Sequence, residues 1–289
     1  MSNKIRLIII CTLFVVALLL FVITRDYENK IVLGSQKTVN AYAPFERSSN
    51  YDIKNKERYA RYYENNKNLD YEEVVTRVNI GLDYGFYNYI KDADLSKGIL
   101  VLTNKFLKLN KEYVPNDLEE INDKYFISGN KKVRFLRKEA KEAFEKLSDD
   151  SIKNKTPVYG QSAFRTYERQ DELYSSATKS YGKEKADLDT ARPGHSEHQT
   201  GLTIDVSSTK QGNMLSFEKT SSYKWMMDNA YKYGFILRYP KDKENIHGFI
   251  YESWHFRYVG VKVAKDMHDN YSDLTYDEYY YIKIENRKS

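Results

Sequence analysis

Cysteine is almost absent from this chain. Its 289 residues contain one cysteine, Cys11, which lies in an apolar run near the N-terminus. The remainder of the chain therefore cannot form disulfide bridges, and a metal site built from several thiolates is excluded. Histidine is scarce as well, with five residues, at positions 195, 198, 247, 255 and 268. A metal site in this chain must combine histidine nitrogens with carboxylate oxygens.

Several kinds of recognition motif are also missing. The chain has no P-loop, no dinucleotide-binding fingerprint, no nucleic-acid-binding motif and no internal repeat. Nucleic acid is therefore not expected as a partner. The composition, 41% hydrophobic and 30% charged, is typical of a globular protein, and the net charge of +5 fits an ordinary solvated surface.

One segment concentrates chemically active residues. Residues 193–205 read P-G-H-S-E-H-Q-T-G-L-T-I-D, and Gly201 to Val206 has the aliphatic and β-branched residues of a short buried strand. Side chains alternate along a strand, so Thr203 and Asp205 should face one side while the aliphatic residues face the other. An ionised aspartate in such surroundings is costly to bury unless a positive group meets it, and a metal ion does so.

A second segment, residues 251–258, reads Y-E-S-W-H-F-R-Y and has the pattern of another strand. Regular alternation would put Glu252 and His255 on opposite faces, so we expect a bulge or a strand end there. Together the two segments supply two histidines, an aspartate and a spare glutamate. A catalytic zinc site needs this inventory: three protein ligands, an open position for water and an unligated carboxylate that takes the water's proton. His195 stays open as an alternative ligand to His198.

The pattern S-x-H-x-x-G-x-x-x-D followed by E-x-W-H resembles that of the VanY-type D-alanyl-D-alanine carboxypeptidases of peptidase family M15. Residues 196–205 and 252–255 match the family motifs almost letter for letter, and S-A-F-R-T-Y-E-R-Q at residues 162–170 is similar to the family's S-G-Y-R-S-Y-x-x-Q. Residues 104–118 look like the segment that leads into the family's catalytic core. The departures remove neither a ligand nor the base: Thr203 and Ala163 stand where Ala and Gly are usual, and Ser253 where Pro is frequent.

The resemblance implies one zinc ion and a role for each residue of the site. The implied set is zinc ligands His198, Asp205 and His255, general base Glu252, substrate-binding cation Arg165, and hydrogen-bonding residues Ser196 and Gln170. An arginine suits this task because its fork of donors fits a carboxylate or a developing oxyanion. Zinc in such a site lowers the pKa of its bound water to ~7 and polarises the carbonyl.

The implied activity is that of a zinc metallocarboxypeptidase that removes the terminal D-alanine from peptidoglycan stem peptides. An L,D-carboxypeptidase that acts on the stem tetrapeptide stays open, because near relatives share every motif quoted. An endopeptidase and a non-catalytic wall-binding protein are weaker alternatives, since the base and all three ligands are present. The sequence carries no indication of an oligomeric state.

The N-terminus predicts a membrane anchor. Leu7 to Ile23 contains no charged residue and, at ~1.5 Å per residue, would span about 25 Å as a helix, enough for the hydrocarbon core. Lys4 and Arg6 favour a cytoplasmic N-terminus. We therefore expect a single-pass protein of the bacterial cell membrane with an extracellular catalytic domain. A cleaved signal peptide is the alternative.

Helical and strand patterns alternate without regular βαβ order along the rest of the chain. This predicts an α+β fold in which helices surround a small antiparallel sheet that carries the zinc site, a Hedgehog- or DD-peptidase-like arrangement preceded by an N-terminal transmembrane helix. The predicted domains are an anchor at 1–25, a polar stalk at 26–70 and the peptidase domain at 71–289. The predicted elements are helices at 54–64, 72–78, 134–147, 168–179, 222–233 and 259–269, and strands at 98–102, 157–159, 163–164, 201–206, 235–238 and 251–258.

Overall fold

The computed structural model describes residues 25, 42–127 and 133–285. The apolar run from Leu7 to Ile23, which the sequence assigns to a transmembrane helix, lies outside these residues. Among the described residues, no helix combines the length and the apolar character needed to cross a membrane. The division of the chain into an anchor, a stalk and a peptidase domain stays a prediction.

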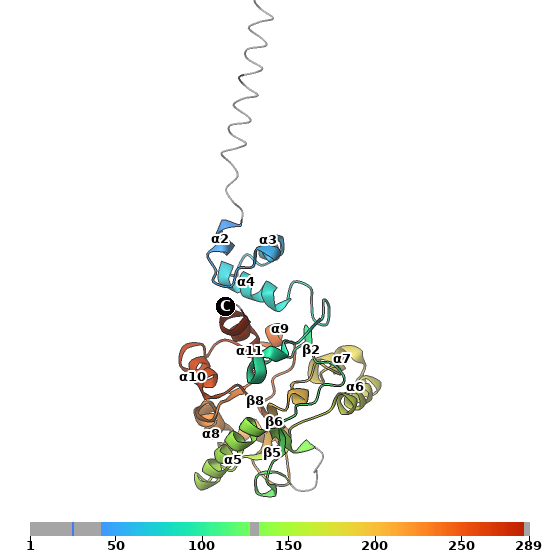
Figure 1. Cartoon of the computed structure of the whole chain (residues 1–289), viewed down its shortest axis with the longest axis vertical. Helices are drawn as coiled ribbons and strands as arrows, with labels where there is room; N and C mark the ends of the chain where they lie inside the picture. The colour runs from blue at the N-terminus through green and yellow to red at the C-terminus, as the bar shows by residue number, and fades with distance from the viewer. Residues whose placement is uncertain (1–24, 26–41, 128–132, 286–289) are drawn as a thin grey trace, which may run out of the picture.

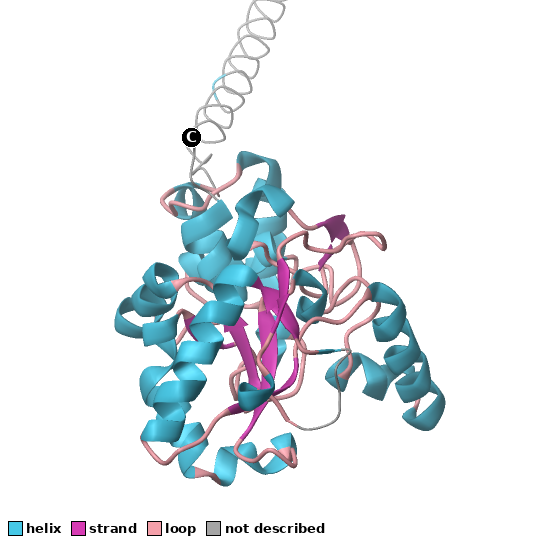
Figure 2. Ribbon diagram, turned by 60° about the horizontal axis from the view of Figure 1, so that its bottom comes forward, coloured by secondary structure: helices cyan, strands magenta, loops and turns pink. Residues whose placement is uncertain are grey.

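A four-stranded sheet, in which every neighbouring pair is antiparallel, lies at the centre of the larger lobe (Figure 2). Its order is β5 (Tyr159–Ser162), β6 (Thr203–Ser207), β8 (His255–Tyr258) and β7 (Phe235–Leu237). The aliphatic residues of β6 enter the hydrophobic core, where they meet the buried side chains of a long helix, α5. The opposite face of the same strands carries the polar residues of the site. One face of the sheet is therefore structural and the other is functional.

The remaining elements surround this sheet (Figure 1). Two small sheets join residues near the lead-in segment: β1 with β2, which are parallel, and β3 with β4, which are antiparallel. The bounds are β1 Lys91–Asp92, β2 Leu107–Lys108, β3 Leu118–Glu120, β4 Phe135–Arg137, α5 Lys138–Lys153, α6 Tyr167–Tyr181, α7 Lys183–Asp189, α8 Ser221–Asn229, α9 Glu244–His247, α10 Val261–Asn270, α11 Tyr276–Tyr279, and 3-10 helices at Ile53–Asn55, Leu95–Leu100, Asp123–Tyr125, Glu197–Thr200, Met214–Lys219 and Ala230–Tyr233.

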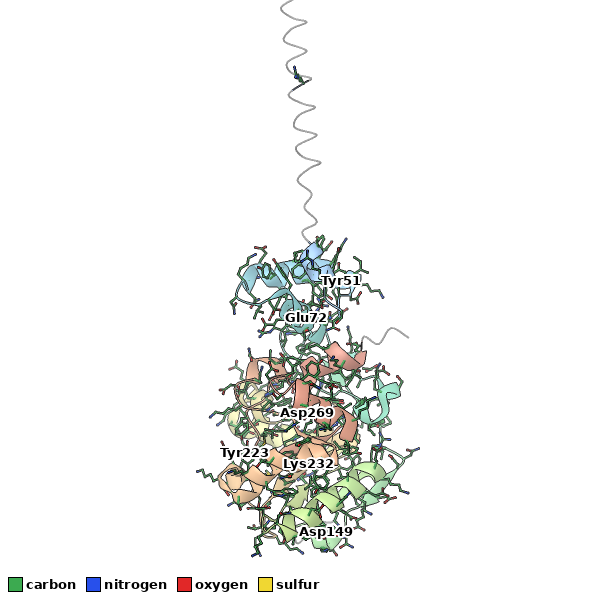
Figure 3. The ribbon with its side chains drawn as sticks, turned by 90° about the vertical axis from the view of Figure 1, so that its left-hand side faces the viewer. Tyr51, Glu72, Asp149, Tyr223, Lys232 and Asp269 are labelled. Atoms are coloured by element: carbon green, nitrogen blue, oxygen red, sulfur yellow. The ribbon has the colours of Figure 1, made fainter. Side chains whose placement is uncertain are left out.

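A separate group of helices lies at one end of the described chain, apart from the four-stranded sheet (Figures 1 and 3). It comprises α2 (Ala43–Glu46), α3 (Lys56–Asn65) and α4 (Tyr71–Ile80), which begins with an Asp70 capping box. These helices share an apolar cluster that includes Phe45 and Tyr59. Residues 43–69, which the sequence assigns to a polar stalk, thus pack against α4. The π-helix Tyr280–Glu285 contacts α4 and joins this group to the larger lobe.

Most predicted elements are present, and the α+β class with a small antiparallel sheet is confirmed. Several predicted elements differ from the structure. β5 covers only Tyr159–Ser162, so residues 157–158 and 163–164 form no strand, and β8 begins at His255 rather than at residue 251. Two further predictions were wrong. Residues 98–102 form no strand; Leu95–Leu100 is a 3-10 helix, interrupted by Gly98 at φ 60°. The helix predicted from Arg134 begins only at Lys138. Phe135–Arg137 forms strand β4 and pairs with β3, so its backbone groups are used in the sheet rather than in a helix. For Phe135–Arg137, pairing with a strand that is distant in sequence overrides the local helical pattern.

Candidate active site

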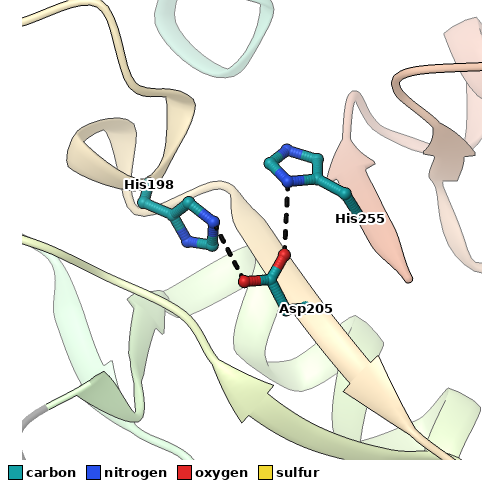
Figure 4. A group of neighbouring side chains, drawn as sticks. All are labelled: His198, Asp205 and His255. Atoms are coloured by element: carbon teal, nitrogen blue, oxygen red, sulfur yellow. Dashed lines mark ion pairs between the residues drawn. The ribbon is translucent and has the colours of Figure 1, made fainter. Parts of the chain in front are cut away.

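Strand pairing brings two of the predicted ligands together. Asp205 on β6 lies directly opposite His255, the first residue of β8, so their side chains project from the same face of the sheet. His198 comes from the 3-10 helix Glu197–Thr200, which precedes β6. Asp205 stands between the two histidines: its Oδ2 lies 3.3 Å from His198 Nε2 and its Oδ1 lies 3.2 Å from His255 Nδ1 (Figure 4).

These three side chains fit a metal ion. One ligand atom from each lies within 4.8 Å of the others, and all three residues are buried. Asp205 Oδ1 is buried without a hydrogen-bond partner, as expected for an oxygen reserved for a cation. Burial alone would raise the pKa of Asp205, but the two histidines hold it well below its ordinary value. Two imidazoles and one carboxylate are a donor set that zinc accepts, with a position left for a further ligand.

Glu252 lies just before β8, at the strand end predicted from the sequence. Its Oε2 is 3.1 Å from His255 Nδ1, so the carboxylate adjoins the candidate metal position. The side chain is 13% exposed, and burial raises its pKa above the ordinary glutamate value. A carboxylate with a raised pKa beside the reacting position suits proton transfer.

Arg165 is positioned by the turn that follows β5. Its Nη1 donates to Gln170 Oε1 (2.7 Å), its Nη2 donates to Ser162 Oγ (3.2 Å), and its Nη2 lies 4.0 Å from Asp205 Oδ2. Gln170 in turn donates from Nε2 to the carbonyl oxygen of Ala191 (2.6 Å). Gln170 therefore holds the guanidinium in place. The structure thus brings Arg165 and Gln170, both singled out in the sequence, together beside Asp205.

A cleft of about 500 Å³ opens over these residues. The buried residue Ser196 lines it, as predicted, whereas the hydroxyl of Thr203 is not among its lining groups. Residues that no sequence motif marked form much of the wall, notably Tyr239, whose ring lies 4.6 Å from that of His255. The cleft is lined by Arg165, Gln170, Leu173, Ser176, Ala177, Ser180, Tyr181, Asp189, Thr190, Ala191, Ser196, Glu197, His198, Asp205, Met214, Leu215, Tyr239, Phe249, Ile250, Glu252, Trp254 and His255.

The remaining histidines do not join the site. His195 directs Nδ1 to the carbonyl oxygen of Asn104 (2.7 Å), within the predicted lead-in segment, so the alternative in which His195 replaces His198 is not supported. His247 bonds backbone atoms, and His268 stacks on Tyr231 at the surface.

Sequence reasoning missed Glu197, which adjoins the ligand His198. Its side chain is fully buried and pairs with Arg238 and Arg257. The only local signal was a charged residue within a buried motif. Its partners are distant in sequence, so the pattern of one segment could not identify them.

Comparison with known proteins identifies relatives of this arrangement. The family model described as "VanY: D-alanyl-D-alanine carboxypeptidase" matches residues 133–261, which include every residue of the predicted site. The YodJ protein of Bacillus subtilis (strain 168) is 41% identical over 207 residues, 69% of this chain and 75% of that protein. A D-alanyl-D-alanine carboxypeptidase of Enterococcus faecium is 30% identical over 285 residues, 94% of this chain and 80% of that protein.

Solved structures share the fold. The LdcB LD-carboxypeptidase is similar with a TM-score of 0.61 and 41% identity, over 67% of this chain and 90% of that one. A mutant of the D,D-pentapeptidase VanY from a VanB-type resistance cassette, solved in complex with Zn(II), is similar with a TM-score of 0.52 and 28% identity, over 62% of this chain and 97% of that one. These findings confirm the predicted metallocarboxypeptidase class and agree with zinc as the predicted cofactor.

Proposed function

The chain belongs to the VanY family of D-alanyl-D-alanine carboxypeptidases, and from this premise we propose that it is a zinc-dependent D,D-carboxypeptidase. Its substrates in this proposal are peptidoglycan stem peptides, from which it removes the terminal D-alanine. One observation carries the proposal: a buried cluster of two histidines and one aspartate shares a cleft with Glu252 and Arg165. Such a set offers ligands for a metal ion, a carboxylate for proton transfer and a cation for the developing negative charge, which are the parts that metal-assisted peptide hydrolysis uses.

In this proposal His198, Asp205 and His255 hold the zinc ion. Zinc in a site of this kind supplies Lewis acidity and lowers the pKa of bound water. The ring nitrogens that face Asp205 are His198 Nε2 and His255 Nδ1, and these are the atoms assigned to the ion. The Nδ1 of His198 lies 2.6 Å from the carbonyl oxygen of Ala163, which fixes the ring with Nε2 free to ligate.

Glu252 is assigned the proton transfers. Its carboxylate takes a proton from the attacking water and returns it to the amine nitrogen of the departing D-alanine. The raised pKa favours the first step, because a carboxylate of higher pKa is a stronger base.

Arg165 is assigned the negative charge of the substrate. Asp205 lies 4.0 Å from its Nη2, so the guanidinium reaches the immediate surroundings of the metal position. This location suits stabilisation of the carbonyl oxygen as it becomes an oxyanion. Arg165 is the only lysine or arginine among the described residues that line the cleft, so it is also the group available to the terminal carboxylate. Ser196 is assigned a supporting hydrogen bond to the substrate.

A second candidate is an L,D-carboxypeptidase that acts on the stem tetrapeptide. The observation in its favour is the similarity to the LdcB LD-carboxypeptidase, which is 41% identical to this chain. Both activities use the same zinc, base and cation, because the bond that breaks is an amide to a terminal D-alanine in each. The two candidates differ only in the residue before that bond.

The test measures D-alanine release by the purified full-length chain in mild detergent. Muramyl pentapeptide and muramyl tetrapeptide are supplied in parallel, before and after zinc removal by a chelator. The proposal expects release from the pentapeptide that stops on chelation and returns with zinc. Faster release from the tetrapeptide would replace the D,D assignment with the L,D one. Absence of release from both by zinc-loaded protein would refute the carboxypeptidase proposal and favour a wall-binding role.

We further propose that the chain is held in the bacterial membrane by residues 1–25, with the peptidase domain outside the cell. The support is the uncharged run from Leu7 to Ile23, which follows the basic residues Lys4 and Arg6. Cell fractionation with protease treatment of intact cells tests this. The expected result is a full-length chain in the membrane fraction that external protease degrades. A chain shortened at its N-terminus and released to the medium would favour the cleaved signal peptide.

A further inference from the structure

The two histidines proposed as zinc ligands differ in how their second ring nitrogen is held. His198 directs that nitrogen, Nδ1, to a backbone carbonyl. His255 directs its second nitrogen, Nε2, toward Glu197, with 3.8 Å between Nε2 and Oε2. Neither of these two buried atoms has another hydrogen-bond partner. Two buried and unsatisfied groups that face each other at this distance need only a small rotation to form a hydrogen bond.

Glu197 is fixed firmly enough to serve as such a partner. Its Oε1 lies 2.9 Å from Arg238 Nε and accepts from Arg257 Nη1 at 2.8 Å, and all three side chains are fully buried. Two guanidinium groups on one oxygen hold the carboxylate in place. The other oxygen, Oε2, is left for His255.

Residues from other parts of the chain hold the two arginines in turn. Arg238 Nη1 pairs with Asp277 Oδ2 of α11 at 2.6 Å, and Asn104 donates to the other oxygen of Asp277 at 2.7 Å. Arg257 donates from Nη2 to the carbonyl oxygen of Val101 at 2.7 Å. The lead-in segment and the C-terminal helix therefore both support the position of Glu197.

We propose that Glu197 is a positioning residue for the metal centre. Its Oε2 accepts the Nε2–H of His255, which places the proton on Nε2 and leaves the lone pair of Nδ1 directed at the metal. The inference rests on the ligand set proposed above and adds the group that selects the tautomer of one ligand. Carboxylates that accept from a ligand histidine in this way orient the ring and make it more basic.

The alternative is that Glu197 only neutralises two buried arginines. Glu197→Gln separates the two roles when it is compared with Asp277→Asn. Both variants remove one negative charge from the same buried network, but only the first touches His255. In Glu197→Gln the carbonyl oxygen must stay with the two guanidinium groups, so the NH2 group replaces Oε2. An NH2 group facing His255 demands a lone pair on Nε2, which puts the proton on Nδ1, where the metal binds.

The test measures zinc affinity of the full-length chain by competition with a chromophoric chelator, and the absorption spectrum of the Co²⁺-substituted protein. Glu197→Gln should weaken zinc binding by about 10- to 100-fold and change the Co²⁺ spectrum. Asp277→Asn should keep the zinc affinity within about threefold of the wild type and keep its spectrum, although its melting temperature falls.

Three results decide the matter. Unchanged zinc affinity in Glu197→Gln, or equal losses in both variants, would overturn the positioning role. If Glu197→Gln does not fold, Glu197→Asp takes its place, because it keeps the charge and withdraws the oxygen from His255; wild-type zinc affinity in that variant would likewise overturn the role. Failure of the wild-type chain to bind one zinc ion, or an undiminished affinity in Asp205→Asn, would instead refute the ligand set itself.

Discussion

Replacement of Glu252 by glutamine tests the assigned proton transfers directly. The change keeps the size of the side chain and removes its capacity to accept a proton. Glu252 Oε2 lies 3.1 Å from His255 Nδ1. The other carboxylates that line the cleft are engaged elsewhere: Asp205 faces the two histidines, Glu197 is bound by two arginines, and Asp189 accepts from the hydroxyls of Tyr181 and Thr190. General acid–base catalysis contributes about 10²- to 10⁴-fold. We therefore expect kcat to fall by about 10²- to 10⁴-fold, which corresponds to roughly 3–5 kcal/mol in the activation barrier.

The assay compares kcat for D-alanine release and the zinc content of wild type, Glu252→Gln and a control, Glu184→Gln. Glu184 is an exposed glutamate on α7, so its replacement should leave both quantities unchanged. Zinc content in Glu252→Gln should stay at the wild-type level, because the carboxylate is not among the proposed ligands. A kcat within tenfold of the wild type at full zinc occupancy would show that Glu252 is not the base. A loss of zinc in parallel with activity would show that Glu252 is a ligand instead.

Three further changes test other parts of the structure. Arg165→Lys should lower kcat by at least about 10²-fold, with a smaller effect on KM, because a single ammonium replaces the fork of donors assigned to the developing oxyanion. A kcat equal to that of the wild type would refute this role of Arg165. Gly160→Ala should destabilise the chain by about 1–3 kcal/mol, seen in denaturant unfolding, because its Cβ would lie 2.6 Å from the ring of Phe126; an unchanged midpoint would contradict this packing. Burial lowers the pKa of His247 to about 4. Between about pH 6.5 and 4 the unfolded chain therefore binds more protons than the native one. The free energy of unfolding thus falls as the pH falls through this window. In the native chain the Nδ1 of His247 accepts from Phe249 N–H. Because asparagine does not titrate, His247→Asn should flatten the stability–pH curve by up to about 3 kcal/mol across that range. An unaltered curve would show that His247 does not contribute.

The candidate metal cluster could be located in the sequence because its residues lie in local patterns. Asp205 stands at the polar position of an alternating strand, and His198 precedes that strand by one turn. The sequence also placed Glu252 at a strand end, since regular alternation was incompatible with a shared site. The register that puts Asp205 opposite His255 was not readable, because strand pairing depends on the whole sheet.

Two cases show most clearly what local sequence patterns cannot predict. Residues 134–137 continue the apolar spacing of α5, yet they pair with β3, and only the fold reveals that partner. Glu197 lies beside a ligand in the motif, but its role depends on Arg238 and Arg257, which lie 41 and 60 positions later (238 − 197 and 257 − 197). A single sequence gives no means of connecting these three residues.

The same reasoning explains why the motifs do not separate D,D- from L,D-carboxypeptidases. In the proposed mechanism the ligands, the base and Arg165 all act on the amide bond to the terminal D-alanine, which is common to both substrates. Discrimination must come from side chains that contact the preceding residue, and these lie outside the sequence motifs.

Two apolar side chains of the cleft that no motif includes are candidates for this role. Leu215 and Ile250, which line its wall, are 75% and 42% exposed. Apolar side chains of this size can select between a methyl group and a longer side chain at the penultimate position, since one methylene group in a hydrophobic pocket is worth about 1–3 kcal/mol of discrimination. Exchange of Leu215 and Ile250 for alanine should therefore alter the ratio of pentapeptide to tetrapeptide turnover while zinc affinity stays constant, and a constant ratio would place the discrimination elsewhere in the cleft.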